Sequence, residues 1–237
     1  MSAKLTFFDI ESTNLNANYG YILCISWKHL GEKEVHCARI DKSPKFKADP
    51  TNDAWVVSQF AKEIANSDIV CGWYSARFDW PFIQSRLLSH GLPTMPPIPH
   101  VDLWRTAKYQ MKLNSNRLAS VSEFLNLDEK TPIRSREWIR AMAGHRKSID
   151  YVVDHCIQDI VVLEQAYMKM RPVMRGHPNV NVVTADLDQP GCPICGSKKL
   201  QKRGRSVAGV GFTQRYHCQG CGGWSRGRPQ RLDVEVR

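Results

Sequence analysis

Three apolar segments with the character of β-strands lie in the first third of the sequence. They are Lys4–Glu11, Tyr19–His29 and Glu34–Asp41, which contain the β-branched and aromatic residues that favour strands. The turn-forming residues 30–32 separate the second segment from the third. Short connections of this kind favour antiparallel pairing, so we expect a meander of three strands at the start of the fold.

The apolar spacing then changes from the strand period to the helical period. A helix is predicted after Asn52 or Asp53, either of which can cap it, because apolar residues recur there at helical spacing. The remaining predicted elements are strands at 68–74 and 100–104 and helices at 79–90, 107–111, 118–125 and 149–170. A meander followed by alternating strands and helices implies an α/β fold, with a mixed β-sheet covered by helices on both faces.

The pattern weakens after residue 172. We expect a first domain at residues 1–172, a polar linker at 173–189 and a small second domain at 190–237. Two strand-like segments, 198–207 and 210–218, are predicted to form the arms of a hairpin in the second domain.

Charge is distributed unevenly between these two domains. The chain has 33 Lys and Arg against 23 Asp and Glu, which gives a formal net charge of +10. Ten of the basic residues and two of the acidic ones lie at 189–237, so the rest of the chain carries only +2. A nearly neutral body with a strongly basic tail indicates a polyanionic partner, most simply nucleic acid, although a basic tail can also serve solubility alone.

Half of the eight cysteines lie in the basic tail. They form two C-x2-C pairs separated by 22 residues: Cys192, Cys195, Cys218 and Cys221. This spacing resembles a zinc ribbon and predicts one zinc ion, with a structural role because four thiolates leave no open coordination position. The other cysteines have apolar neighbours in the sequence and are expected in the core: Cys24, Cys37, Cys71 and Cys156.

Basic and aromatic residues are interspersed around the paired cysteines. Basic groups attract phosphates, and exposed aromatic rings can stack on unpaired bases. The residues expected to contact nucleic acid are Lys198, Lys199, Lys202, Arg203, Arg205, Arg215, Trp224, Arg226 and Arg228. The alternative for the aromatic residues is that they form the small core of this domain.

Acidic residues at the ends of apolar elements form a second candidate site. Asp9 and Glu11 lie two positions apart on the first predicted strand, so both side chains point to the same face. Two carboxylates at the edge of a core repel each other, and a divalent cation would neutralise them. Asp79 lies at a predicted helix start, where helix capping would also explain it.

The longest predicted helix contains one more acidic residue. Asp159 is flanked by apolar residues, and an unpaired buried carboxylate there would be costly. His155 lies four positions earlier and therefore on the same side of the helix. A structural His–Asp pair is the alternative to a catalytic role.

Taken together, these residues resemble the DEDD superfamily of 3′→5′ exonucleases, the proofreading-type nucleases with an RNase H-like fold. The resemblance covers about residues 4–170, and its three motifs correspond to 7–13 (FFDIEST), 75–79 (SARFD) and 155–159 (HCIQD). It implies an RNase H-like mixed sheet and a catalytic site with two Mg²⁺ or Mn²⁺ ions. The metal ligands that it implies are Asp9, Glu11, Asp79 and Asp159.

The sequence departs from the family pattern at two positions. The third motif is usually Tyr-x3-Asp or His-x4-Asp, whereas His155 has the tyrosine-type spacing. The resemblance implies that His155 orients or deprotonates the attacking water, because imidazole is a competent base near neutral pH. Tyr151, one turn earlier, is a second candidate for this role. Ser75 stands where Asn is common, a change that affects either the positioning of the terminal nucleotide or nothing.

We therefore expect a metal-dependent 3′→5′ exonuclease that hydrolyses single-stranded nucleic acid, with the zinc ribbon aiding substrate binding. DNA is favoured over RNA by the resemblance alone, and a polymerase or another replication or repair protein is an expected partner. The alternatives are a catalytically weakened nucleic-acid-binding adaptor and a structure-specific endonuclease. Without a membrane-spanning apolar run or a secretion signal in the sequence, the expected location is cytoplasmic.

Overall fold

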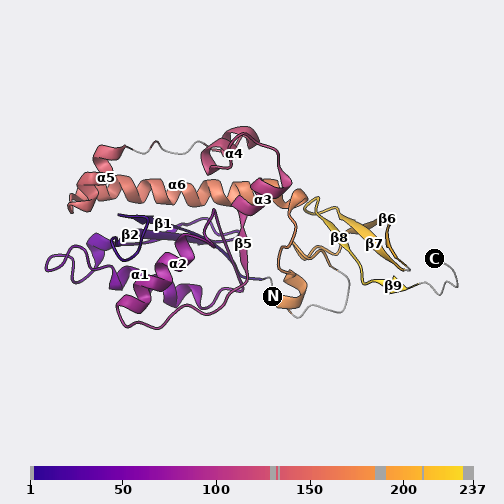
Figure 1. The fold of residues 1–237 in the computed structure, drawn as a ribbon, viewed down its shortest axis with the longest axis horizontal. Helices are drawn as coiled ribbons and strands as arrows, with labels where there is room; N and C mark the ends of the chain where they lie inside the picture. Colours follow the sequence, from indigo (N-terminus) through magenta and orange to yellow (C-terminus); the bar gives the residue numbers. More distant parts are fainter. Residues whose placement is uncertain (1–2, 129–131, 133, 185–190, 210, 232–237) are drawn as a thin grey trace. The chain divides into compact units, whose positions relative to one another are not determined.

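The computed structural model describes residues 3–128, 132, 134–184, 191–209 and 211–231. The chain divides into two compact units, one formed by Lys4–Tyr167 and the other by the residues from Met168 onward together with Ala3 (Figure 1). None of the helices among the described residues combines the length and the hydrophobicity that a membrane-spanning segment requires.

The larger unit is built on a five-stranded β-sheet with the strand order β3-β2-β1-β4-β5. The strands are β1 (Leu5–Ser12), β2 (Ile22–His29), β3 (His36–Arg39), β4 (Ile69–Gly72) and β5 (His100–Asp102). The first three strands form the antiparallel meander that the sequence predicts. β4 and β5 run parallel to β1, so three strands end at the same edge of the sheet.

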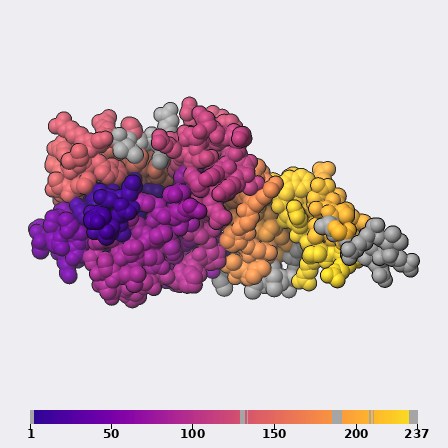
Figure 2. Space-filling view, in the orientation of Figure 1, coloured from indigo at the N-terminus to yellow at the C-terminus, as the bar shows by residue number. Residues whose placement is uncertain are grey.

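Helices cover both faces of this sheet, as the alternating pattern predicts (Figure 1). They are α1 (Ala54–Ile64), α2 (Asp79–Ser89), α3 (Leu103–Gln110), α4 (Leu118–Leu125), α5 (Ser135–Met142) and α6 (Arg146–Met170), with a 3-10 turn η1 (Ile40–Lys42). On one face, the ring of Phe7 lies 5.5 Å from that of Tyr167 in α6. On the other, Phe8 lies 5.4 Å from Phe60 in α1. In the space-filling view, the indigo N-terminal segment reaches the surface between the pink α5–α6 segment and the magenta α2 segment (Figure 2).

Two helix boundaries differ from the sequence-based expectation, and one helix was not predicted. α3 begins at Leu103, which shortens the strand predicted at 100–104, because the Asp102 carboxylate accepts a hydrogen bond from Trp104 N at 3.1 Å and caps the helix. α6 begins at Arg146 rather than at 149. α5 was not predicted; of its eight residues only Ala141 is fully buried, and Trp138 packs against the core.

The smaller unit contains a four-stranded antiparallel sheet. Its strands are β6 (Leu200–Ala208), β7 (Gly211–Cys218), β8 (Trp224–Arg226) and β9 (Gln230–Arg231). The two predicted hairpin arms correspond to β6 and β7. Val210, assigned to the second arm, lies outside the described residues.

Part of the stretch predicted as a polar linker has regular structure. It includes the end of the 3-10 turn η2 (Arg171–Val173) and the short helix α7 (Val180–Val183). Asn179 caps α7 by accepting a hydrogen bond from Asn181 N at 3.1 Å. The side chain of Asn181 then donates to the carbonyl of Cys192 at 3.1 Å, which ties α7 to the cysteine-containing segment. Residues 185–190 of the expected linker lie outside the described residues.

Candidate active site

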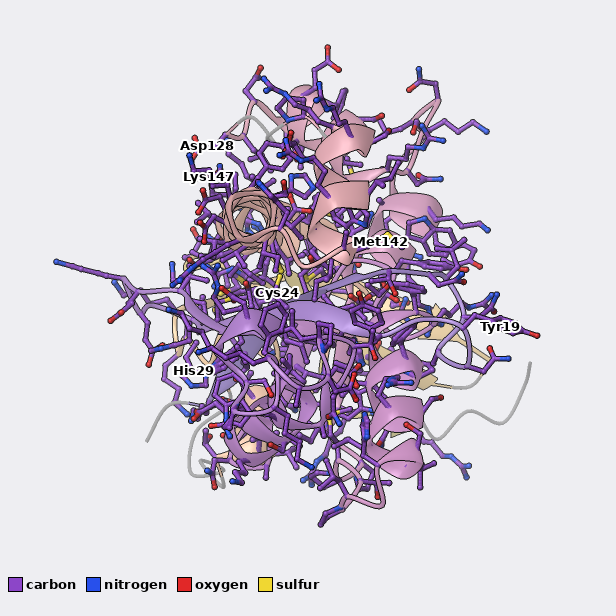
Figure 3. The ribbon with its side chains drawn as sticks, turned by 90° about the vertical axis from the view of Figure 1, so that its left-hand side faces the viewer. Tyr19, Cys24, His29, Asp128, Met142 and Lys147 are labelled. Carbon is purple, nitrogen blue, oxygen red and sulfur yellow. The ribbon has the colours of Figure 1, made fainter. Side chains whose placement is uncertain are left out.

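The central strand β1 carries Asp9 and Glu11 to the edge of the core. Both are half-buried, whereas residues 5–8 are fully buried. Glu11 pairs with Cys24 of β2, and Figure 3 shows Cys24 between the sheet and α6. Because directly paired residues and residues two apart point to the same face, Asp9 and Glu11 both face α6.

Asp79 reaches the same strand from the start of α2. The last pair between β1 and β4 joins Phe7 to Cys71, so β1 continues past the end of its neighbour. There the Asp79 Oδ1 accepts a hydrogen bond from the N–H of Ile10 at 3.2 Å, and only 4% of Asp79 is exposed. Burial, reinforced by the charge of Asp102, raises the pKa of Asp79 to about 7.

α6 brings His155 and Asp159 against the acidic end of β1. The Nε2 atom of His155 lies 3.8 Å from Glu11 Oε1 and 4.0 Å from Asp159 Oδ2. Glu11, His155 and Asp159 can each place one ligand atom within 4.8 Å of the others. On the same helix, the Cys156 thiol lies 3.7 Å from Asp9 Oδ2. Segments that are far apart in the sequence therefore meet at one place.

The donor atoms at this place suit hard divalent cations. Asp9 and Glu11 form one group with Cys156, and Glu11 and Asp159 form another with His155; we call Asp9, Glu11 and Asp159 the carboxylate cluster. Carboxylate oxygens are the preferred ligands of Mg²⁺ and Mn²⁺, so these residues fit the metals that the sequence motifs imply. Asp79 contacts the backbone between Asp9 and Glu11, but no group of three close ligand atoms among the described residues includes it.

The two candidates for the general base, His155 and Tyr151, lie in different surroundings. His155 is 3% exposed and lies against the carboxylate cluster, as given above. The Tyr151 hydroxyl instead donates to the carbonyl of Pro132, and its ring packs near the guanidinium of Arg134. Ser75, the second departure from the family pattern, is 1% exposed and hydrogen-bonds with His100 Nε2 at 2.8 Å. This hydrogen bond joins the segment after β4 to strand β5.

A cavity of about 650 Å³ opens beside the carboxylate cluster. Asp9 and Asp159 line it together with three aromatic residues, Trp73, Tyr74 and Trp104, and with residues 115–118. The aromatic residues follow β4 and β5 at the sheet edge where ligands of open α/β sheets bind. The volume lies within the range of about 300–1,000 Å³ that is typical of ligand pockets. These aromatic residues belong to none of the sequence motifs that predict the site.

The four cysteines of the smaller unit form a separate site. Each offers a sulfur within 4.8 Å of the others, and the Cys192–Cys221 and Cys195–Cys218 pairs are 3.6 and 3.7 Å apart. Sulfurs bound at about 2.3 Å around a tetrahedral zinc ion would be about 3.8 Å apart, so the arrangement fits zinc. Although burial opposes it, backbone N–H groups at residues 220–221 lower the pKa of Cys218 to about 7, whereas burial raises the pKa of Cys192 to about 11 and also raises that of Cys221.

One face of the β7–β8 pair concentrates positive charge beside an exposed ring. Arg215 lies directly opposite Arg226, and His217 lies opposite Trp224. The His217 and Trp224 rings are 4.8 Å apart, and Trp224 is 52% exposed. Like charges placed directly opposite each other destabilise a sheet unless an anion neutralises them. The nine residues predicted to contact nucleic acid are all exposed, namely Lys198, Lys199, Lys202, Arg203, Arg205, Arg215, Trp224, Arg226 and Arg228.

Comparison with known proteins places the larger unit in a known superfamily. No curated protein sequence matches the chain. A solved structure that shares this fold over part of its length is the family B DNA polymerase from the hyperthermophilic archaeon Pyrobaculum calidifontis, with a TM-score of 0.54 and 15% sequence identity. The alignment covers 89% of this chain but 32% of the polymerase. The sequence profile of the RNase H superfamily matches residues 6–171, more than half of the protein. The chain therefore belongs to the RNase H superfamily.

Proposed function

We propose that the protein is a metal-dependent 3′→5′ exonuclease that acts on single-stranded nucleic acid, with DNA favoured over RNA. The observation that carries this proposal is the meeting of the carboxylate cluster with His155 beside an open cavity. The superfamily and the fold shared with a DNA polymerase support a nuclease, whereas the polarity rests on the three sequence motifs.

In this proposal the protein would hold two Mg²⁺ or Mn²⁺ ions with Asp9, Glu11, Asp79 and Asp159. Bound ions would neutralise charge on the scissile phosphate and make water more acidic. His155 would orient the attacking water and accept its proton, since its Nε2 atom lies beside Glu11 and Asp159. Hydrolysis of the terminal phosphodiester would release a nucleoside 5′-monophosphate.

An oligonucleotide labelled at its 5′ end, incubated with the protein and Mg²⁺, tests the polarity. We expect a ladder that shortens stepwise from the 3′ end, and faster loss of a DNA strand than of an RNA strand with the same sequence. Internal cuts at structured sites would instead indicate the endonuclease. Binding without cleavage would indicate the adaptor.

We further propose that the smaller unit is a zinc ribbon that holds the substrate strand. One zinc ion bound by its four cysteines would have a structural role. The opposed arginines Arg215 and Arg226 would each neutralise a phosphate, and Trp224 would stack on a base. A polymerase or another replication or repair protein remains the proposed partner.

Replacement of both Arg215 and Arg226 by glutamine is expected to weaken binding and its salt dependence. Each phosphate contact on a single strand contributes about 0.7 to the slope of log K against log salt, so the slope should become shallower by about 1.4. Fluorescence anisotropy of a labelled oligonucleotide at several NaCl concentrations measures this. A matched control replaces two exposed lysines of the larger unit, Lys33 and Lys62, by glutamine. An unchanged slope in the arginine variant would exclude this face as the binding surface.

A further inference from the structure

We infer that the cavity beside the carboxylate cluster is a nucleobase-binding subsite, in which Tyr74 and Trp104 stack on the base of the terminal nucleotide. The inference rests on the proposed function for the identity of its ligand. It assigns binding of nucleic acid to the nearly neutral larger unit, whereas the charge pattern alone indicates only the basic tail.

Tyr74 has a backbone conformation that is costly for an aromatic residue. Its φ is 63°, in the left-handed region that glycine and asparagine favour. The N–H of Tyr74 donates to Asp102 Oδ1 at 3.0 Å, which fixes this conformation, and the side chain is 39% exposed at the cavity. Strain of this kind concentrates at ligand sites, where the surrounding structure enforces it.

The same carboxylate positions the second ring. Asp102 Oδ1 also accepts from Trp104 N at 3.1 Å, so a single carboxylate oxygen fixes the backbone of both aromatic residues. The two rings are 4.9 Å apart and inclined at 72°, an edge-to-face contact. The Lys108 ammonium lies 4.7 Å from the centre of the Trp104 ring. The aromatic wall is therefore held in place before any ligand arrives.

The segment between α3 and α4, which also lines the cavity, is held in place as well. Trp73 Nε1 donates to the carbonyl of Asn116 at 3.1 Å, which ties the segment between α3 and α4 to the segment that follows β4. The exposed Arg117 lies between α3 and α4 and lines the cavity. The same cavity is thus lined by aromatic rings and by the carboxylates of Asp9 and Asp159. A nucleotide fits this mixed lining, because its base can stack on the rings while its phosphate binds the cations that the carboxylates would hold.

Binding of 2′-deoxyadenosine to the full-length protein tests the subsite without hydrolysis. An uncharged nucleoside is used because Asp9 and Asp159 would repel a phosphate when a chelator removes divalent cations. We expect saturable binding in equilibrium dialysis, weakened roughly 10-fold by Tyr74→Asn and by Trp104→Leu, within the range for loss of one stacking ring. Asparagine tolerates the left-handed conformation, so Tyr74→Asn removes the ring without adding strain.

Tyr109→Ala is the matched control, because Tyr109 is a 63% exposed aromatic residue of α3 that does not line the cavity. This variant should bind deoxyadenosine as the wild type does. Absence of saturable binding to the wild type, or unchanged affinity in both ring variants, would overturn the subsite. Ring-dependent binding without any hydrolysis of oligonucleotides would support the subsite and refute the exonuclease. Hydrolysis combined with ring-independent binding would refute the subsite alone.

Discussion

Replacement of Asp159 by asparagine is expected to lower metal-dependent hydrolysis of a single-stranded oligonucleotide by about three to four orders of magnitude. The substitution keeps the size of the side chain but removes a negative charge where divalent cations would bind. Such cations contribute several kcal/mol to transition-state stabilisation, and about 1.4 kcal/mol corresponds to a tenfold change in rate. Asp9→Asn should have a similar effect, since Asp9 lines the same cavity. Initial rates of mononucleotide release at saturating Mg²⁺ measure both.

Asp154→Asn is the matched control, because Asp154 is an exposed carboxylate on the same helix, α6. Its rate should equal that of the wild type. Titration with Mn²⁺, followed by electron paramagnetic resonance, gives a readout that does not depend on activity: Asp159→Asn should bind the ion more weakly, and Asp154→Asn should not. Equal rates and equal Mn²⁺ affinities in the wild type, Asp159→Asn and Asp154→Asn would exclude the carboxylate cluster as the catalytic centre.

The sequence could predict those parts of the candidate site that depend only on how side chains repeat along a single strand or helix. Asp9 and Glu11 share a face because side chains alternate along a strand, and His155 and Asp159 share a side because they are one helical turn apart. The position of Asp79 has a different origin. It depends on β4 ending before β1 does, which leaves the N–H of Ile10 available to the start of α2. Strand lengths in a sheet are set by pairing between distant segments, which no local pattern reports.

For the same reason, local sequence patterns could not predict that Tyr74 and Trp104 line one cavity. Tyr74 and Trp104 each follow a short apolar strand, where an aromatic residue is most simply explained by packing. Their proximity results from the parallel pairing of β4 with β5, and their orientation from the single carboxylate of Asp102. Once the sheet order is known, however, the parallel strands share one edge, and the residues that follow them become candidates for ligand contact.

Replacement of Cys218 by serine is expected to remove zinc from the protein and to unfold the smaller unit. Within the described part of residues 191–231, the buried apolar side chains are those of Cys192, Ile194 and Cys218, far too few to stabilise a sheet by themselves. Zinc binding contributes about 10–16 kcal/mol in comparable small metal-bound folds, so loss of one thiolate should be decisive. Elemental analysis should fall from one zinc per chain to nearly none. Limited proteolysis should then cleave within 191–231 while residues 4–167 stay protected.

Cys37→Ser is the matched control, because Cys37 is a half-buried thiol of the larger unit and does not belong to the four-cysteine group. It should keep one zinc per chain and the wild-type proteolysis pattern. A Cys218→Ser protein that retained stoichiometric zinc, or whose 191–231 segment resisted protease without zinc, would contradict a structural metal site. Because Arg215, Trp224 and Arg226 lie on strands that this metal would hold together, the zinc-free protein should also lose the salt-dependent part of nucleic-acid binding that these side chains provide. Hydrolysis would persist at high substrate concentration, since the carboxylate cluster belongs to the other unit.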